Sequence, residues 1–495
     1  MNDDARLREH VRPPGWRNPS PAPRYDLVVI GGGTAGLVCA AGASGLGARV
    51  ALVERALLGG ECLNTGCVPS KSLLRSARAA SEMHGAASLG MTAAGPPDFG
   101  AVMARLRARR ADLAPHDSAE RLKSLGVDVF FGTAAFSSPR SVTVRSNGSN
   151  AADDSGVVLR FRKAVIATGS RPLVPDIPGL AGTPFLTSDT LFDLTDRPKS
   201  LIVIGAGPTG CEMAQAFAGL GTRVTLVESS PHVLPNEDAE AGAILGDRLR
   251  KDGVELRLGA AIAAVRWSQG CFVLDGAGPA MSAEAVLVAT GRTPCADGLD
   301  LDAAGVAHDA KGVTADDFLR TTNRRVFAAG DVCSRLKFTH MADAMARIVI
   351  QNALFFGRRR VSALVVPSCT FTSPQVAHVG RTVAEASASG ADTITIPLSS
   401  VDRAVVDEAT AGFLRIHHTG GRIVGATIVA PEAGEMIGTI VLAMQHGHGL
   451  ADLASVSFPY PTVSLALRQA GDAYRRSRLT PVVRALLRYY LSAFR

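Results

Sequence analysis

Residues 26–36 read DLVVIGGGTAG, and this stretch decides the fold because a short apolar run leads directly into a glycine cluster. Gly31, Gly33 and Gly36 fit the pattern G-x-G-x-x-G. In that pattern the first glycine turns the chain, the second lets the backbone approach a pyrophosphate, and the third packs a helix against a strand. An Ala-rich stretch and a second apolar run follow, and we expect Glu54, at the end of that run, to bind a ribose hydroxyl. The segment predicts a βαβ unit that binds a dinucleotide.

The same plan returns as LIVIGAGPTG at residues 201–210. Gly205, Gly207 and Gly210 take the glycine positions, and Glu228 takes the acidic one, again 23 positions after the first glycine. An apolar run ending at Gly291 follows this unit, as a similar run follows the first, and we assign Gly291 to the second site. One glycine hexapeptide also marks ordinary turns, but two with matched acids favour two nucleotide-binding domains in tandem.

Length, hydropathy and charge indicate how many domains to expect and which partners to exclude. The 495 residues, 46% of them hydrophobic, are enough for several compact domains. No uninterrupted apolar run of about eighteen residues occurs, and the N-terminal residues lack the pattern of a signal peptide, so we expect a cytoplasmic protein. The net charge of +7 comes from scattered arginines without interleaved aromatic residues, which argues against a nucleic-acid partner.

Residues 59–71 read GGECLNTGCVPSK and place two thiols, Cys62 and Cys67, at a predicted helix start. A helix N-terminus favours thiolate, which attacks disulfides, binds soft metals or donates charge to a flavin. We prefer this redox interpretation to that of two buried packing cysteines. The other six cysteines lie singly in the sequence, and His446 and His448 occupy a predicted helix end, so we expect no metal site.

The cysteine segment resembles the redox helix of the class I flavin disulfide reductases, which include dihydrolipoamide dehydrogenase, glutathione reductase and mercuric reductase. The resemblance runs from about residue 25 to residue 474. It implies that FAD occupies the first nucleotide site and NADH or NADPH the second. It also implies that Cys62 faces the substrate as the interchange thiol, while Cys67 is the charge-transfer thiol against the flavin.

Further roles follow from the same resemblance. Lys71 is expected near the flavin N5 edge, paired with Glu212. Asp331 looks like the acid that binds the ribityl chain of FAD, with Thr168 and Gly169 close to the same cofactor. The alternative for Lys71 and Glu212 is an ordinary surface ion pair, which contributes little.

The resemblance implies an α/β fold with two Rossmann-like FAD- and NAD(P)-binding domains and a C-terminal α+β dimerisation domain. The family forms homodimers whose active sites span both subunits. The expected boundaries are a flexible arm at 1–23, an FAD-binding domain at 24–172 and 296–363, an NAD(P)-binding domain at 173–295, a dimerisation domain at 364–475, and a basic helix at 476–495.

Glu228 also bears on the choice of nicotinamide. A carboxylate at this position accepts from the 2′-hydroxyl of NADH and repels the 2′-phosphate of NADPH, so the sequence favours NADH. Arg223 and His232 are near enough in sequence to reach an added phosphate, although solvated surface side chains are the simpler interpretation.

The sequence departs from the family at FPYPTVSL, residues 458–465. Disulfide reductases carry a His-Pro-His-Pro-Thr stretch here, followed by Glu, whereas this chain has Tyr460 for the basic histidine and Leu465 for its acid. Tyrosine, with an ordinary pKa near 10, exchanges protons poorly at neutral pH. Phe-Pro-Tyr instead resembles mercuric reductases, whose tyrosine lies beside the metal. An interface aromatic is an equally weighted interpretation of Tyr460.

We therefore predict an FAD-dependent NAD(P)H oxidoreductase that passes electrons through Cys62 and Cys67 to Hg(II) or a disulfide. The printed sequence has neither an N-terminal Cys-x-x-Cys nor a C-terminal cysteine pair to deliver metal, since its last cysteine is Cys369. Dihydrolipoamide dehydrogenase, a flavin diaphorase or oxidase, and a non-catalytic FAD-binding redox sensor remain alternatives.

Residues 480–491 read TPVVRALLRYYL and predict a terminal helix, with Thr480 as its N-cap and Pro481 at its first position. Arg484 and Arg488 lie four apart on one face. We favour packing of this helix on the dimer or on its own domain over contact with an anionic membrane.

Overall fold

The computed structural model describes residues 2–92, 95–146, 156–276 and 278–494, which divide into two compact units. Unit 1 comprises Met1–Gly205, Gly219–Thr222 and Ile262–Leu364; unit 2 comprises Ala206–Ala218, Arg223–Ala261 and Val365–Arg495. The expected NAD(P)-binding domain at 173–295 has residues in both units, so the expected domain boundaries stay predictions.

The largest sheet of unit 1 has the strand order β3-β2-β1-β6-β5-β4, with β18 also paired to β6. The pairs β1–β2, β2–β3, β1–β6 and β6–β18 are parallel, whereas β4, β5 and β6 form an antiparallel meander. These strands are β1 (Tyr25–Ile30), β2 (Val50–Glu54), β3 (Val127–Phe131), β4 (Thr133–Ser138), β5 (Ser141–Arg145), β6 (Val157–Ile166) and β18 (Val326–Ala328). Every residue of β2 is buried, as expected for a central parallel strand between covered faces.

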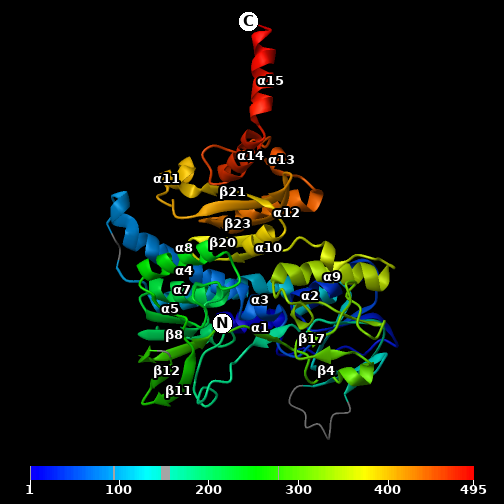
Figure 1. Cartoon of the computed structure of the whole chain (residues 1–495). Helices are drawn as coiled ribbons and strands as arrows, with labels where there is room; N and C mark the ends of the chain where they lie inside the picture. The colour runs from blue at the N-terminus through cyan, green and yellow to red at the C-terminus, as the bar shows by residue number, and fades with distance from the viewer. Residues whose placement is uncertain (1, 93–94, 147–155, 277, 495) are drawn as a thin grey trace. The chain divides into compact units, whose positions relative to one another are not determined.

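Helices α2 (Thr34–Gly45) and α9 (Thr339–Leu354) lie side by side in unit 1 (Figure 1). The other helices of this unit are α1 (Asp3–Val11), α3 (Gly60–Asn64), α4 (Cys67–Gly85), α5 (Phe99–Leu113) and α6 (Ala119–Ser124). Its remaining longer strands are β7 (Ser170–Pro172), β8 (Ser200–Ile204), β11 (Ile262–Ser268), β12 (Cys271–Gly276), β13 (Gly278–Ala283), β14 (Ala285–Val288) and β15 (Arg292–Pro294). Strands β8 and β14 pair in parallel, and β11, β12 and β13 are antiparallel.

Unit 2 is built on a five-stranded antiparallel sheet with the order β19-β20-β23-β22-β21. These strands are β19 (Pro367–Thr370), β20 (Gln375–Gly380), β21 (Asp392–Pro397), β22 (Phe413–Thr419) and β23 (Arg422–Ala430). A parallel pair, β9 (Arg223–Glu228) with β10 (Glu255–Leu258), belongs to the same unit. Its helices are α7 (Pro208–Gly219), α8 (Ala239–Lys251), α10 (Val383–Ala388), α11 (Asp402–Val406), α12 (Ala433–His446), α13 (Leu450–Leu453), α14 (Leu465–Ser477) and α15 (Pro481–Ser492).

The N-terminal segment differs from the mobile arm that the sequence predicts for residues 1–23. Helix α1 begins after Asn2, whose side chain accepts from the backbone N–H of Ala5 at 2.8 Å. Leu7 and Val11, four residues apart on one face, are both buried. The helix is hard to predict because the segment is rich in Pro and Arg, and two apolar residues are too few to establish a helical period.

The C-terminal helix starts as the sequence predicts. Thr480 caps α15 by accepting from the backbone N–H of Val483 at 3.3 Å, and Pro481 is the first helical residue. Every described residue from 475 to 494 is exposed, so α15 extends beyond α14 without packing on unit 2 (Figure 1). Within the described residues no helix has both the length and the apolar character needed to span a bilayer.

The buried face of α1 predicts a stability effect. We expect Leu7→Ala to lower the free energy of unfolding by about 2–5 kcal/mol, because it removes a buried leucyl group and leaves a cavity. Urea unfolding followed by circular dichroism measures the change, with exposed Glu9→Ala on the same helix as the control. Equal stabilities of the two variants would show that α1 is not packed as described.

Candidate redox-active site

The first glycine loop has a backbone that only glycine fits. Gly31 has φ +108°, and a Cβ at this position would lie 2.3 Å from the carbonyl oxygen of Ala167. A Cβ on Gly36 would lie 1.8 Å from the carbonyl oxygen of Gly31. The loop between β1 and α2 is therefore stripped of side chains where backbone N–H groups at a helix start can receive a pyrophosphate.

Glu54 lies at the carboxyl end of β2, beside this loop. Its carboxylate is 8% exposed and accepts from the backbone N–H groups of Gly32 and Ala56, each at 2.6 Å. Burial raises the pKa of Glu54, and the two backbone donors oppose that rise. The structure thus holds the predicted ribose acceptor against the dinucleotide loop.

The glycine loop also contacts the cysteine segment through backbone atoms. The N–H of Gly59 donates to the carbonyl oxygen of Gly32 at 2.9 Å. A Cβ on Gly60 would lie only 2.6 Å from the Cα of Gly33. Because no side chains separate the two segments here, the start of α3 is held directly against the predicted pyrophosphate site.

The two candidate thiols lie on consecutive helices, one in α3 and the other at the start of α4, within hydrogen-bonding reach of each other. Cys67 is exposed and is the first residue of α4, whereas Cys62 is partly buried in α3. The hydrogen bond to Cys67, together with burial, raises the pKa of the Cys62 thiol above its usual range. The Cys67 sulfur lies 3.4 Å from the hydroxyl of Thr339. Once one thiol of such a pair ionises, the other retains its proton more strongly.

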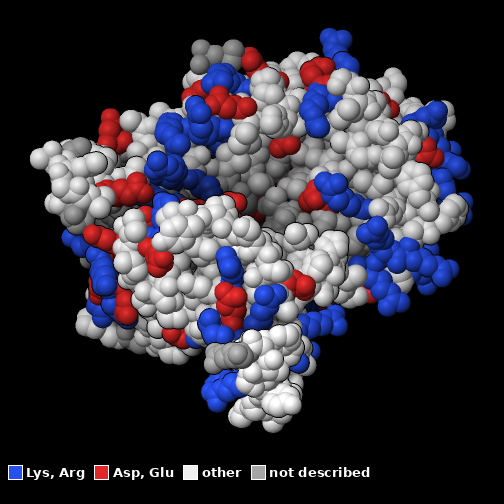
Figure 2. All heavy atoms as spheres, turned by 90° about the horizontal axis from the view of Figure 1, so that it is seen from above, with Lys and Arg blue, Asp and Glu red and all other residues white. Residues whose placement is uncertain are grey.

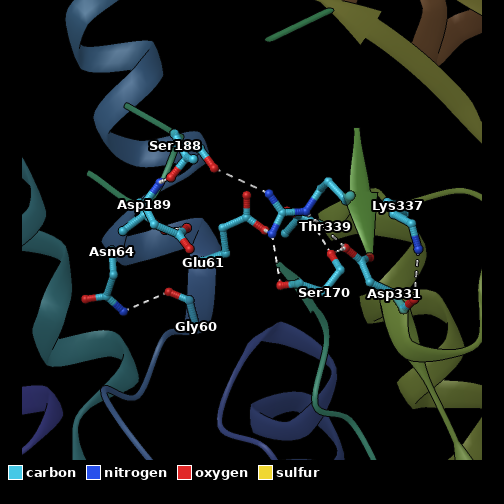
Figure 3. Close-up of polar contacts among 12 residues, drawn as sticks. Gly60, Glu61, Asn64, Ser170, Ser188, Asp189, Asp331, Lys337 and Thr339 are labelled. Carbon is cyan, nitrogen blue, oxygen red and sulfur yellow. Dashed lines mark hydrogen bonds and ion pairs between the residues drawn. The ribbon is translucent and has the colours of Figure 1, made fainter. Parts of the chain in front are cut away.

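A polar cluster lies next to the cysteine segment. Figure 3 shows the side chains of Glu61, Ser170 and Asp331 gathered in this cluster. The guanidinium group of Arg292 contacts all three. Arg292 Nη2 is 2.6 Å from Glu61 Oε2, and its Nε donates to Ser170 Oγ at 2.7 Å. Ser170 Oγ in turn donates to Asp331 Oδ2 at 2.6 Å. Burial raises the pKa of Glu61 to about 7, although the charge of Arg292 opposes this rise.

Asp331 reaches this cluster from the segment that follows β18. Gly330 has φ +78°, and a Cβ on it would lie 3.4 Å from the Cβ of Ala35 in α2. Lys337 Nζ donates to the backbone carbonyl of Asp331 at 3.0 Å. The hydroxyl of Thr168 donates to the carbonyl oxygen of Cys295 at 2.6 Å, which fixes the turn before Ser170. Unit 1 therefore gathers predicted FAD-site residues from separate parts of the sequence.

Three residues of this cluster were not identified from the sequence: Glu61, Ser170 and Arg292. Each is the neighbour of a residue that was, namely Cys62, Gly169 or Gly291. Their position next to a motif residue was the only indication in the sequence. The motifs do not indicate that these three side chains contact one another.

The second nucleotide loop has a similar local geometry. Gly205 has φ +102°, and a Cβ there would lie 2.7 Å from the carbonyl oxygen of Ala289. In unit 2 the carboxylate of Glu228 accepts from the backbone N–H groups of Ala206 at 2.7 Å and Ser230 at 2.9 Å. Partial burial favours the neutral acid, but these donors outweigh it and lower the pKa of Glu228. The carboxylate is therefore ionised at neutral pH.

The predicted pair Lys71 and Glu212 belongs to different units and stays a prediction. Lys71 lies in α4 of unit 1. Glu212 lies in α7, is buried in unit 2, and accepts from the backbone N–H of Phe371 at 2.9 Å.

Tyr460 is 73% exposed within the chain, and its hydroxyl donates to Asp402 Oδ2 at 3.0 Å. The hydrogen bond to Asp402 raises the pKa of the Tyr460 hydroxyl. No sequence motif indicates Asp402 as its partner, because Asp402 lies 58 positions away in the chain.

Comparisons with known proteins agree with this geometry. The model of the pyridine nucleotide-disulphide oxidoreductase family matches residues 25–346, and that of its dimerisation domain matches residues 366–470. Mercuric reductase of Staphylococcus aureus is 34% identical over 460 residues, which cover 90% of this chain and 82% of the relative. Dihydrolipoyl dehydrogenase 2 of Haloarcula marismortui is 34% identical over 468 residues, covering 91% and 96%. The Cu(II) complex of RclA, an HOCl-induced flavoprotein disulfide reductase from Escherichia coli, matches with a TM-score of 0.81 at 29% identity, covering 91% of this chain and all of RclA.

The chain belongs to the pyridine nucleotide-disulphide oxidoreductase family. This confirms the predicted fold class, with its two nucleotide-binding regions and its C-terminal dimerisation domain, and it supports a homodimer. Enzymes of this family use FAD and NAD(P)H. The residues of unit 1 fit FAD, because the glycine positions leave no room for side chains and the carboxylate of Glu54 accepts from the loop at Gly32.

The glycine loop predicts a specific loss of flavin. We expect Gly36→Ala to lower FAD affinity at least about tenfold, since its Cβ would displace the Gly31 carbonyl and so the pyrophosphate cradle. Gly45→Ala at the end of the same helix is the control, because its Cβ meets nothing within 4 Å. Flavin absorbance per protein and circular dichroism give the readout; full flavin content in a folded Gly36→Ala variant would contradict the assignment.

Proposed function

We propose that this flavoprotein uses NAD(P)H to reduce Hg(II), or alternatively a disulfide, at the Cys62–Cys67 pair. The observation that carries the proposal is the thiol pair, with Cys62 in α3 and Cys67 at the start of α4, within hydrogen-bonding reach and beside the glycine loop. FAD, held by the glycine loop and Glu54, would supply the chemistry that links hydride transfer from the nicotinamide to two-electron reduction of this pair.

The chemistry of the two thiols suits a thiophilic acceptor. In a disulfide reaction one thiolate attacks the substrate, breaks its S–S bond and releases one sulfur as a thiolate, which leaves a mixed disulfide. The second thiolate then displaces the other substrate sulfur and closes the Cys62–Cys67 bond. With Hg(II), both thiols lose their protons and bind the ion as soft ligands. Two electrons then pass to the metal as the pair closes to the Cys62–Cys67 disulfide, which NAD(P)H reduces again. Cys67 is the exposed first residue of α4, while burial and the hydrogen bond to Cys67 raise the pKa of the Cys62 thiol.

Tyr460 supports Hg(II) ahead of a disulfide. A dithiol product must be protonated as it leaves, and the hydrogen bond to Asp402 makes the Tyr460 hydroxyl a poorer proton donor by raising its pKa. Reduction of Hg(II) to the metal requires no such proton. The similarity to the S. aureus mercuric reductase favours the same acceptor.

Lipoamide is the second candidate substrate. The Haloarcula dihydrolipoyl dehydrogenase has the same 34% identity over a slightly longer alignment. The tyrosine at position 460 argues against efficient lipoamide turnover. Comparing the rates of NADH oxidation with Hg(II) and with lipoamide therefore distinguishes the two acceptors.

The thiol pair predicts which substitutions abolish acceptor reduction. We expect Cys62→Ser and Cys67→Ser each to lower the Hg(II)-dependent rate of NADH oxidation by about 100-fold or more, because neither serine hydroxyl replaces a thiolate. Both variants should retain FAD. Cys271→Ser, at a partly buried thiol on β12, is the control. Unchanged rates in both active-site variants would identify a flavin diaphorase, and faster turnover of lipoamide than of Hg(II) by the parent would favour a lipoamide dehydrogenase.

Glu228 predicts a preference for NADH. We expect Glu228→Gln to reduce the NADH-to-NADPH ratio of kcat/KM by about tenfold or more, because it removes a charged acceptor for the 2′-hydroxyl and the repulsion of a 2′-phosphate. Steady-state rates with both nucleotides measure the ratio, and Glu255→Gln on neighbouring β10 is the control. A parent enzyme that prefers NADPH would show that another residue binds the phosphate.

A further inference from the structure

Helix α15 presents large apolar side chains to solvent along its whole length. Val482, Leu486, Tyr489, Tyr490 and Leu491 are each between 56% and 78% exposed. Val483, Leu487 and Phe494 in the same segment are between 36% and 74% exposed. Contiguous exposed apolar surface of this kind marks a contact site, and an isolated helix of 12 residues is marginal in water.

The apolar side chains occupy one broad side of the helix. At helical spacing, Val482, Leu486 and Tyr490 share a face, whereas Arg484 and Arg488 lie four apart on the opposite side. Tyr489 borders the apolar side, where its ring can be buried while its hydroxyl stays in water. This distribution is typical of helices that lie in the interface of a bilayer.

The C-terminal tail, residues 475–495, differs in charge from the rest of the chain. Residues 475–495 contain six arginines and no acidic residue, and so account for all but one of the seven excess positive charges. On the face drawn in Figure 2, by contrast, acidic and basic side chains lie among one another over most of the surface. The five arginines of the tail within the described range, at positions 475, 476, 478, 484 and 488, are all exposed.

We propose that residues 475–494 bind the surface of an anionic lipid bilayer, with α15 lying in the interface. The unbalanced positive charge complements anionic headgroups, while the apolar side enters the acyl boundary. A second copy of the chain would cover the apolar side equally well, but it would bring a further set of arginines and no acidic residue from the same segment. At about 1.5 Å per residue, the 12 residues of α15 are too short to cross a hydrocarbon core of about 30 Å.

Vesicle co-sedimentation of the full-length FAD-loaded protein tests this proposal. We expect binding to phosphatidylcholine vesicles containing phosphatidylglycerol to exceed binding to pure phosphatidylcholine vesicles by about tenfold or more at low salt, and to fall as salt is raised. Leu486→Glu, and separately Arg484→Glu with Arg488→Glu, should each reduce the binding by about tenfold or more. Leu46→Glu is the matched control, because Leu46 and Leu486 are 61% and 62% exposed.

Size-exclusion chromatography with light scattering is run on the same samples. The proposal expects the same oligomeric mass for the parent and for Leu486→Glu. It is overturned if the parent does not sediment with anionic vesicles, or if Leu46→Glu loses binding as strongly as Leu486→Glu. A reduced oligomeric mass for Leu486→Glu also overturns it, because α15 would then dock on a second copy of the chain.

Discussion

The redox centre depends on the close approach of two glycine-containing backbones. The Gly59 N–H donates to the Gly32 carbonyl, and a Cβ on Gly60 would lie only 2.6 Å from the Cα of Gly33, so this position tolerates no side chain. Gly32 and Gly33 belong to the dinucleotide loop, whereas Gly59 and Gly60 lead into the cysteine segment. Electron transfer between a flavin and a thiol requires such proximity, and the chain obtains it by leaving out side chains rather than by adding a specific contact.

Each buried or partly buried carboxylate of the site has hydrogen-bond donors or a cation beside it. Glu54 accepts hydrogen bonds from two backbone N–H groups, while Asp331 accepts one from the hydroxyl of Ser170. Glu61 lies with Arg292, yet burial still raises its pKa to about 7. A carboxyl that titrates near neutrality beside the thiol pair makes the local charge sensitive to its surroundings, which is common where chemistry occurs.

Local motifs made much of this structure predictable from the sequence. Gly31, Gly36 and Glu54 could be placed because a strand, a tight turn and a helix impose their spacing within a few residues. Arg292 and Ser170 could not, since they are 122 residues apart and their contact depends on the path of the chain. The same limit applies to Asp402 as the partner of Tyr460. Helix α1 was missed for another reason: two buried residues in nine give too weak a periodic signal, although its cap and acidic first turn were visible.

Anaerobic titration of the purified protein with NADH, followed by Hg(II), tests the central claim that the thiol pair and the flavin form one redox unit. We predict that addition of NADH produces a long-wavelength thiolate-to-flavin absorption band, that Cys67→Ser lacks this band, and that Hg(II) discharges it over repeated cycles. Flavin reduction without such a band in the parent protein would contradict the claim, because it would show that Cys67 does not lie against the flavin.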